Sequence, residues 1–126
     1  MDMIIERTTR RVITLVDDEL ILEGRKRGYD PKTLWYCVER DGYFGFQNPE
    51  TGEYLGHDGE GGIRTMDHLL EWEFFTPRRH PAGGYQLLSP SETQPSALRV
   101  VCVNGTRLIR RHHGTTLWDF LRVDAL

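Results

Sequence analysis

Two short clusters of arginine and histidine are the most obvious candidates for chemistry in this chain. They are Arg78, Arg79 and His80, and Arg110, Arg111, His112 and His113. A guanidinium group can hold a carboxylate or a phosphate through two N–H groups at once, so we predict ligand binding at both clusters. The alternative is that they are solvated loop charges. Adjacent histidines on an extended chain point apart, and no third ligand has matching spacing, so no metal site is predicted.

A catalytic function would require acid–base groups, for which His57 and His80 are the candidates. His57 precedes Asp58 at an expected hairpin tip, where the carboxylate could orient the imidazole. Arg78 or Arg79 would then hold an anionic group of the substrate. Such a protein would be a cofactor-independent isomerase, cyclase or lyase, working at the mouth of a small barrel.

We favour a structural role over a catalytic role for these residues. Aspartate suits a hairpin turn for its geometry alone. The chain contains no nucleophile elbow, P-loop, dinucleotide fingerprint or paired-cysteine metal motif. We therefore predict a non-catalytic binding module without a cofactor, whose ligand is a protein or a small molecule, and keep the enzyme as the alternative.

Composition predicts one soluble domain. The chain has 126 residues, a hydrophobic fraction of 38%, a charged fraction of 28% and a formal net charge of −3. The negative charge argues against a nucleic-acid partner, and no apolar run is long enough for a membrane span. The first residues lack the apolar core of a secretory signal, so a cytoplasmic location is expected.

The elements that must position any site are short strands. Runs rich in β-branched and aromatic residues, such as residues 10–16, alternate with turns of glycine, proline, asparagine and aspartate. Asp41-Gly42 is predicted to be a turn, and Asn104-Gly105 a type I′ hairpin turn. The polar segment 89–96 is expected to be an exposed loop. No sustained 3.6-residue periodicity occurs, so helix content should be low.

Three similar strands, each carrying a tryptophan, indicate a threefold repeat. Trp35, Trp72 and Trp118 occupy similar places in units of about 1–41, 42–83 and 84–126. On a strand, each tryptophan and the residue two positions later share a face, so we expect all three indoles in the core. Three four-stranded units predict an all-β fold, the β-trefoil, as a single domain over residues 1–126. Cys37 and Cys102 lie in apolar β-type runs and are expected to be buried thiols.

The middle unit resembles a repeat of fascin-like β-trefoils. It contains Gly-x-Tyr-Leu-Gly-x-Asp at residues 52–58, a glycine-rich turn, a β-type strand at 62–65, and Glu-Trp-Glu-Phe at 71–74. The resemblance implies a β-trefoil and, since fascins bundle actin with four tandem trefoils, a single contact surface for which actin is a possible partner. The chain departs from ricin-type lectin trefoils, whose units end in Gln-x-Trp, and this departure argues against a galactose-type lectin role.

Overall fold

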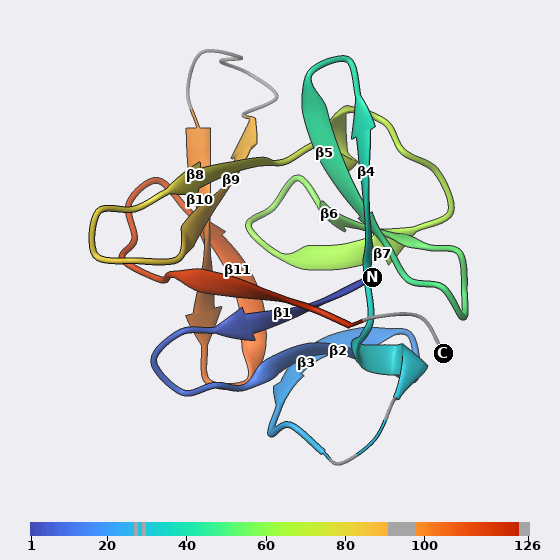
Figure 1. Cartoon of the computed structure of the whole chain (residues 1–126). Coiled ribbons are helices and arrows are strands. Elements are labelled where there is room, and N and C mark those ends of the chain that lie inside the picture. The colour runs from blue at the N-terminus through green and yellow to red at the C-terminus, as the bar shows by residue number, and fades with distance from the viewer. Residues whose placement is uncertain (27, 29, 91–97, 124–126) are drawn as a thin grey trace.

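The computed structural model describes residues 1–26, 28, 30–90 and 98–123, and in this part the regular elements are β-strands and two short 3-10 helices (Figure 1). The strands are β1 (Asp2–Glu6), β2 (Val12–Val16), β3 (Glu19–Glu23), β4 (Tyr36–Arg40), β5 (Tyr43–Gln47), β6 (Tyr54–His57), β7 (Ile63–Met66), β8 (Thr76–Arg79), β9 (Tyr85–Pro90), β10 (Leu98–Asn104), β11 (Arg107–Arg111) and β12 (Trp118–Arg122). The 3-10 helices are η1 (Pro31–Thr33) and η2 (Glu71–Glu73). No helix in the described ranges is long and apolar enough to cross a membrane.

Pairing between the strands repeats three times. The first strand of each unit meets the start of the last strand through equivalent residue pairs, which are Asp2–Trp35, Phe44–Phe75 and Tyr85–Trp118. Within each unit the second and third strands form a hairpin: β2–β3, β6–β7 and β10–β11. Among the described strands all pairings are antiparallel, in one sheet of eight strands and one of four. The predicted all-β fold of three four-stranded units is therefore confirmed.

Two of the three tryptophans lie in the core as predicted. Trp35 and Trp118 are fully buried, and their indole N–H groups donate to the carbonyl oxygens of Ile13 at 3.1 Å and Val101 at 3.3 Å. These bonds satisfy the one polar atom of each indole inside an apolar cluster. The cluster's other members are Ile4, Ile13, Leu15, Leu20, Leu22, Phe46, Leu55, Phe75, Leu87, Val101 and Leu108.

The prediction that Trp72 is a third core residue is wrong. Trp72 lies in η2 rather than in a strand, and 40% of its surface is exposed. Phe75, which is 1% exposed, takes the position equivalent to Trp35. Trp35 comes two positions after η1, and Phe75 comes two positions after η2. The residue that corresponds to Trp35 in the middle unit is therefore Phe75, three positions after Trp72.

Two further expectations need correction. Cys102 is buried as predicted, but Cys37, which lies on β4, is exposed, so the prediction of a buried thiol is wrong there. Ser89 is fully buried in β9 although it was expected in an exposed loop; the part of that loop spanning 91–97 lies outside the described residues.

The two predicted hairpin turns have different outcomes. Asp41 and Gly42 both have positive φ, as expected for the predicted turn. At the β10–β11 hairpin, Asn104 pairs with Arg107, so the central turn residues are Gly105 and Thr106. Only Gly105 has a positive φ there, so the turn is centred one residue later than predicted and is not of type I′, which requires a positive φ at both central residues.

Candidate ligand-binding pocket around Trp72

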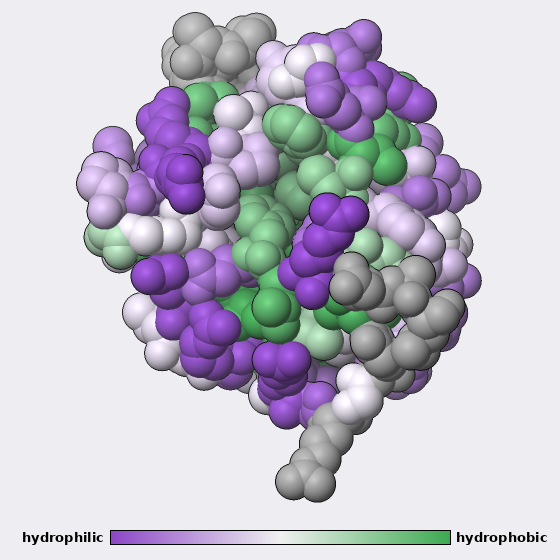
Figure 2. All heavy atoms as spheres, in the orientation of Figure 1, coloured by the Kyte–Doolittle hydropathy of each residue, from purple (hydrophilic) through white to green (hydrophobic). Residues whose placement is uncertain are grey.

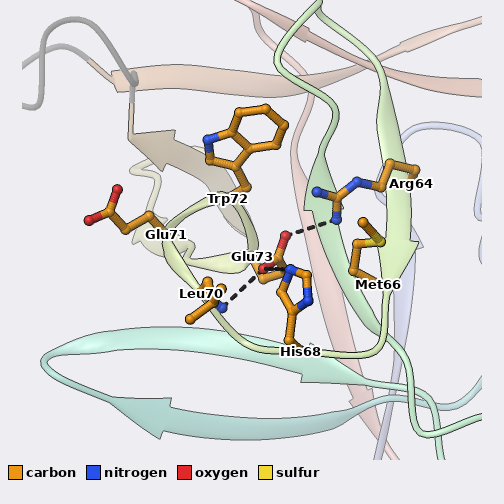
Figure 3. Close-up of a pocket in the computed structure, with 7 residues that line it drawn as sticks. All are labelled: Arg64, Met66, His68, Leu70, Glu71, Trp72 and Glu73. Carbon is orange, nitrogen blue, oxygen red and sulfur yellow. Dashed lines mark hydrogen bonds and ion pairs between the residues drawn. The ribbon is translucent and has the colours of Figure 1, made fainter.

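A hollow of about 500 Å³ lies between β7 and η2 in the middle unit (Figure 3). Its lining residues are Arg64, Met66, His68, Leu70, Glu71, Trp72 and Glu73. In Figure 3, Leu70 and Trp72 stand across the hollow from Arg64 and Met66. Three of these residues, Met66, Leu70 and Trp72, are among the large hydrophobic side chains that the described part of the chain exposes. The hollow therefore combines exposed apolar surface with charged groups.

Glu73 fixes the shape of this pocket. Its side chain is fully buried and accepts hydrogen bonds from Nη1 of Arg64 at 2.8 Å and from the backbone N–H of Leu70 at 3.0 Å. Nε2 of His68 lies 3.3 Å from Oε1 of Glu73. A buried carboxylate is tolerated only when it is paired and hydrogen-bonded in this way. Glu73 thus ties η2 to β7 and is an anchor of the pocket.

Trp72 is held in place from the hairpin β6–β7. The imidazole of His57, which is 1% exposed, stacks on the indole with ring centroids 4.9 Å apart. Gly59 has a φ of +83°, and a Cβ added there would lie 2.9 Å from the indole ring. The guanidinium carbon of Arg64 is 5.8 Å from the indole centroid, within the range of a cation–π contact. The exposed part of the indole is therefore preorganised.

Hydrogen-bonding groups surround the indole and remain available. Within the described residues, Arg64 donates through Nη1 to Glu73, and its other N–H groups make no hydrogen bond. The side chain of Glu71 is exposed. His68 is about half exposed. The pocket can thus offer donors and acceptors beside an apolar ring.

The first predicted cluster does not line this pocket. Arg78 and Arg79 end β8 and are exposed, and Arg79 lies opposite Tyr85 in the β8–β9 pair. His80 begins the turn that follows, where its Nδ1 accepts a hydrogen bond of 3.0 Å from the N–H of Ala82. Their binding of an anion stays a prediction.

The structure divides the second predicted cluster. Arg110 is only 4% exposed, and its Nη1 donates to Oγ of Ser89 at 3.3 Å and to the carbonyl oxygen of Pro90 at 3.4 Å. Arg111, His112 and His113 are exposed. Arg110 therefore packs inside the protein, whereas its three neighbours face solvent. Among the described residues, no three His, Cys, Asp or Glu side chains are grouped to hold a metal.

The two histidines of the catalytic hypothesis lie on separate hairpins. His57 ends β6, directly before the hairpin turn, and its side chain is buried against Trp72. Its Nδ1 accepts a 3.0 Å hydrogen bond from the N–H of Gly59. His80 lies in the β8–β9 turn. Each imidazole therefore accepts a hydrogen bond from the backbone of its own turn, and a catalytic role for the two stays a prediction.

Asp58 occupies the tip itself and closes the turn. Its Oδ1 accepts hydrogen bonds from the backbone N–H groups of Glu60 at 2.7 Å and Gly62 at 2.9 Å. Desolvation by burial acts to raise the pKa of Asp58, but these bonds and the charge of Arg110 outweigh it. The pKa of Asp58 is therefore lowered from its ordinary value.

Comparison with known proteins gives matches in structure alone. No family model and no curated protein sequence matches this chain. One similar structure is the GlcNAcα1-4Gal releasing endo-β-galactosidase from Clostridium perfringens, with a TM-score of 0.82 and 18% identity. That match covers 98% of this chain and 32% of the enzyme, so this chain spans about a third of its length.

Two smaller proteins match over nearly their whole length. SeviL, in a structure bound to asialo-GM1 saccharide, has a TM-score of 0.78 and 16% identity over 98% of this chain and 97% of SeviL. The designed threefold-symmetric protein ThreeFoil has a TM-score of 0.77 and 12% identity over 97% of this chain and 98% of ThreeFoil. At such identities the likeness establishes the fold, which is that of the β-trefoil proteins.

Proposed function

We propose that this β-trefoil is a non-catalytic module that binds a glycan in the pocket around Trp72. The observation that carries the proposal is the exposed indole, held against His57 at a centroid distance of 4.9 Å and bordering a hollow of about 500 Å³. A sugar ring has an apolar face of C–H groups and a rim of hydroxyl groups. The indole offers an apolar surface for the C–H face, and the charged groups offer hydrogen-bond partners for the hydroxyl groups.

The dimensions and polar groups of the pocket fit a small saccharide. Ligand pockets in proteins commonly enclose about 300–1,000 Å³, and a few polar groups in an apolar lining orient the ligand. Arg64 has N–H groups to donate to hydroxyl oxygens, and Glu71 has a carboxylate to accept from hydroxyl hydrogens. Glu73 is already satisfied by protein partners, so it holds Arg64 in place and leaves ligand contact to the others.

The similar structures support a glycan as the first ligand class to examine. SeviL is described as bound to asialo-GM1 saccharide, and the clostridial enzyme as releasing GlcNAcα1-4Gal. Galactose-containing glycans are therefore the first members of a test panel. The proposed site does not depend on a Gln-x-Trp motif, which this chain lacks, because Trp72 lies in the 3-10 helix before the last strand of its unit.

A protein ligand is the competing occupant of the same surface. The resemblance to fascin-like repeats covers residues 52–74, and Met66, Leu70 and Trp72 expose apolar area there. A protein such as actin would bury the exposed Leu70, which lies on the rim of the pocket beside Trp72. A glycan would rely chiefly on Trp72 and on the polar groups.

Glycan-array binding of three tagged proteins tests the proposal. Wild type is compared with Trp72→Ala and with Tyr36→Ala, a matched control that removes another exposed aromatic residue from outside the pocket. We expect wild type and Tyr36→Ala to bind the same glycans and Trp72→Ala to lose them. Absence of wild-type binding across the array, or equal binding by Trp72→Ala, would overturn the proposal.

A further inference from the structure

A second hollow, of about 280 Å³, lies where β1, β5 and β9 begin, at the opposite end of these strands from the hairpins β2–β3, β6–β7 and β10–β11. The residues that matter in its lining are Asp2, Cys37, Phe44, Phe46, Tyr85 and Phe120. Figure 2 shows a hollow with hydrophobic residues near the centre of the face, between the β4–β5 and β8–β9 hairpins, with hydrophilic residues around it. None of these residues belongs to the pocket around Trp72.

Aromatic rings dominate this hollow and hold one another in place. Phe46 and Phe120 are stacked with centroids 5.7 Å apart and planes inclined by 12°. Tyr85 meets Phe120 edge to face, with centroids 5.4 Å apart and planes inclined by 66°. Phe46 is buried in the core, so the rings above it stand on a rigid base.

The pseudo-threefold repeat is broken by a charge at this end. Asp2, Phe44 and Tyr85 occupy equivalent positions, opposite Trp35, Phe75 and Trp118 respectively. Two of the three are aromatic and the third is a carboxylate. No ion pair of the Asp2 side chain occurs among the described residues, and Asp2 is the single charged residue in the lining.

The carboxylate of Asp2 borders the hollow. Although Cys37 is exposed overall, partial burial of its thiol raises the pKa of that group, and the carboxylates of Asp2 and Glu39 raise it further. Arg79 and Arg122 lie opposite Tyr85 and Asp2 in the strand register, but neither lines the hollow. The lining therefore consists of aromatic rings, Cys37, Pro77 and one carboxylate.

From this geometry we propose that the open end of the barrel is a binding site for a small organic cation, of the quaternary or methylated ammonium class. The faces of aromatic rings attract such cations, and a nearby carboxylate adds Coulomb attraction in a partly desolvated setting. Phe44, Tyr85 and Phe120 supply the rings and Asp2 supplies the charge. The site is independent of glycan binding, since the two pockets share no residue.

The test is a titration followed by amide NMR signals, with choline as the probe. Its neutral isostere 3,3-dimethylbutan-1-ol and the anion hexanoate are titrated in parallel. We expect choline to shift the signals of Phe44, Tyr85 and Phe120 saturably. A cation–π contribution of about 1–2 kcal/mol corresponds to about tenfold in affinity, so the neutral isostere should bind about tenfold more weakly.

Two variants test whether the carboxylate of Asp2 contributes to choline binding. Asp2→Asn should weaken choline binding about tenfold. Glu50→Gln, which removes an exposed carboxylate from the turn after β5, should leave it unchanged. Equal binding of the isostere, stronger binding of hexanoate, no response to choline, or an unchanged affinity in Asp2→Asn would each overturn the proposal. Because the isostere is tested on wild type, the proposal remains testable even if Asp2→Asn fails to fold.

Discussion

The imidazole of His57 lies against the indole of Trp72, with ring centroids 4.9 Å apart and planes inclined by 28°. The histidine is buried and the tryptophan is 40% exposed, so the pair joins the interior of the β6–β7 hairpin to the surface of η2. Because the indole is supported in this way, it does not need a ligand to order it. A preorganised ring costs less conformational entropy on binding.

The exposed tryptophan should matter less for stability than a buried one. We expect Trp118→Ala to lower the free energy of unfolding by about 3–5 kcal/mol, because it empties a fully buried site. Trp72→Ala should cost about 1–2 kcal/mol, since part of its surface is already in water. Urea denaturation measures both. Equal losses would show that Trp72 is a core residue after all.

Replacing Gly59 should disturb the indole directly. Gly59→Ala introduces a Cβ 2.9 Å from the Trp72 ring as well as a strained positive φ. Gly105→Ala is the matched control, because its φ is +65° and nothing lies within 4 Å of the added Cβ. Strain alone should cost each variant about 1–3 kcal/mol in unfolding free energy. Glycan affinity should fall only in Gly59→Ala, and a parallel fall in Gly105→Ala would contradict this.

The buried carboxylate should be a structural anchor. Glu73→Gln leaves the guanidinium of Arg64 without its charged partner, so we expect a loss of about 1–3 kcal/mol in unfolding free energy. Glu71→Gln changes an exposed neighbour and should stay within about 0.5 kcal/mol of wild type. Chemical denaturation of both variants gives the comparison. Similar small effects would mean that the Arg64–Glu73 pair does not fix the pocket.

Asp58 should make stability depend on pH in the acid range. Because its pKa is lower in the folded chain, its contribution is present above the ordinary value of about 4 and is lost as the pH falls through the lowered value. We expect Asp58→Asn to be less stable than wild type at neutral pH, with the difference shrinking on acidification. Denaturation curves at several pH values measure this. A difference independent of pH would contradict the assigned role.

The sequence predicted the architecture better than the site. Strand and turn patterns are local, so Asp41-Gly42 and the buried Trp35 and Trp118 could be inferred from residue types and spacing. Trp72 could not, because a single 3-10 turn shifted the match by three residues and moved the indole to the surface. A signal was available in Phe75, an apolar residue three positions later that could equally fill the core position.

The pocket residues were missed for a physical reason. Arg64, His68 and Glu73 meet only when η2 folds back on β7, and each alone has an ordinary residue type for a loop or strand. The clusters that begin at Arg78 and Arg110 stand out in the sequence because their arginine and histidine residues follow one another directly. Density along the chain does not predict convergence in space, as the burial of Arg110 demonstrates.

The most direct test of glycan binding at Trp72 follows the three indole N–H signals in an NMR titration with saccharides chosen from the array. The indoles of Trp35 and Trp118 are buried and bonded to backbone carbonyls, so their signals should stay in place. We predict that one signal moves saturably and that this signal is absent in Trp72→Phe. If it stays fixed while array-positive glycans saturate the protein, Trp72 is not the binding surface and the central claim is wrong.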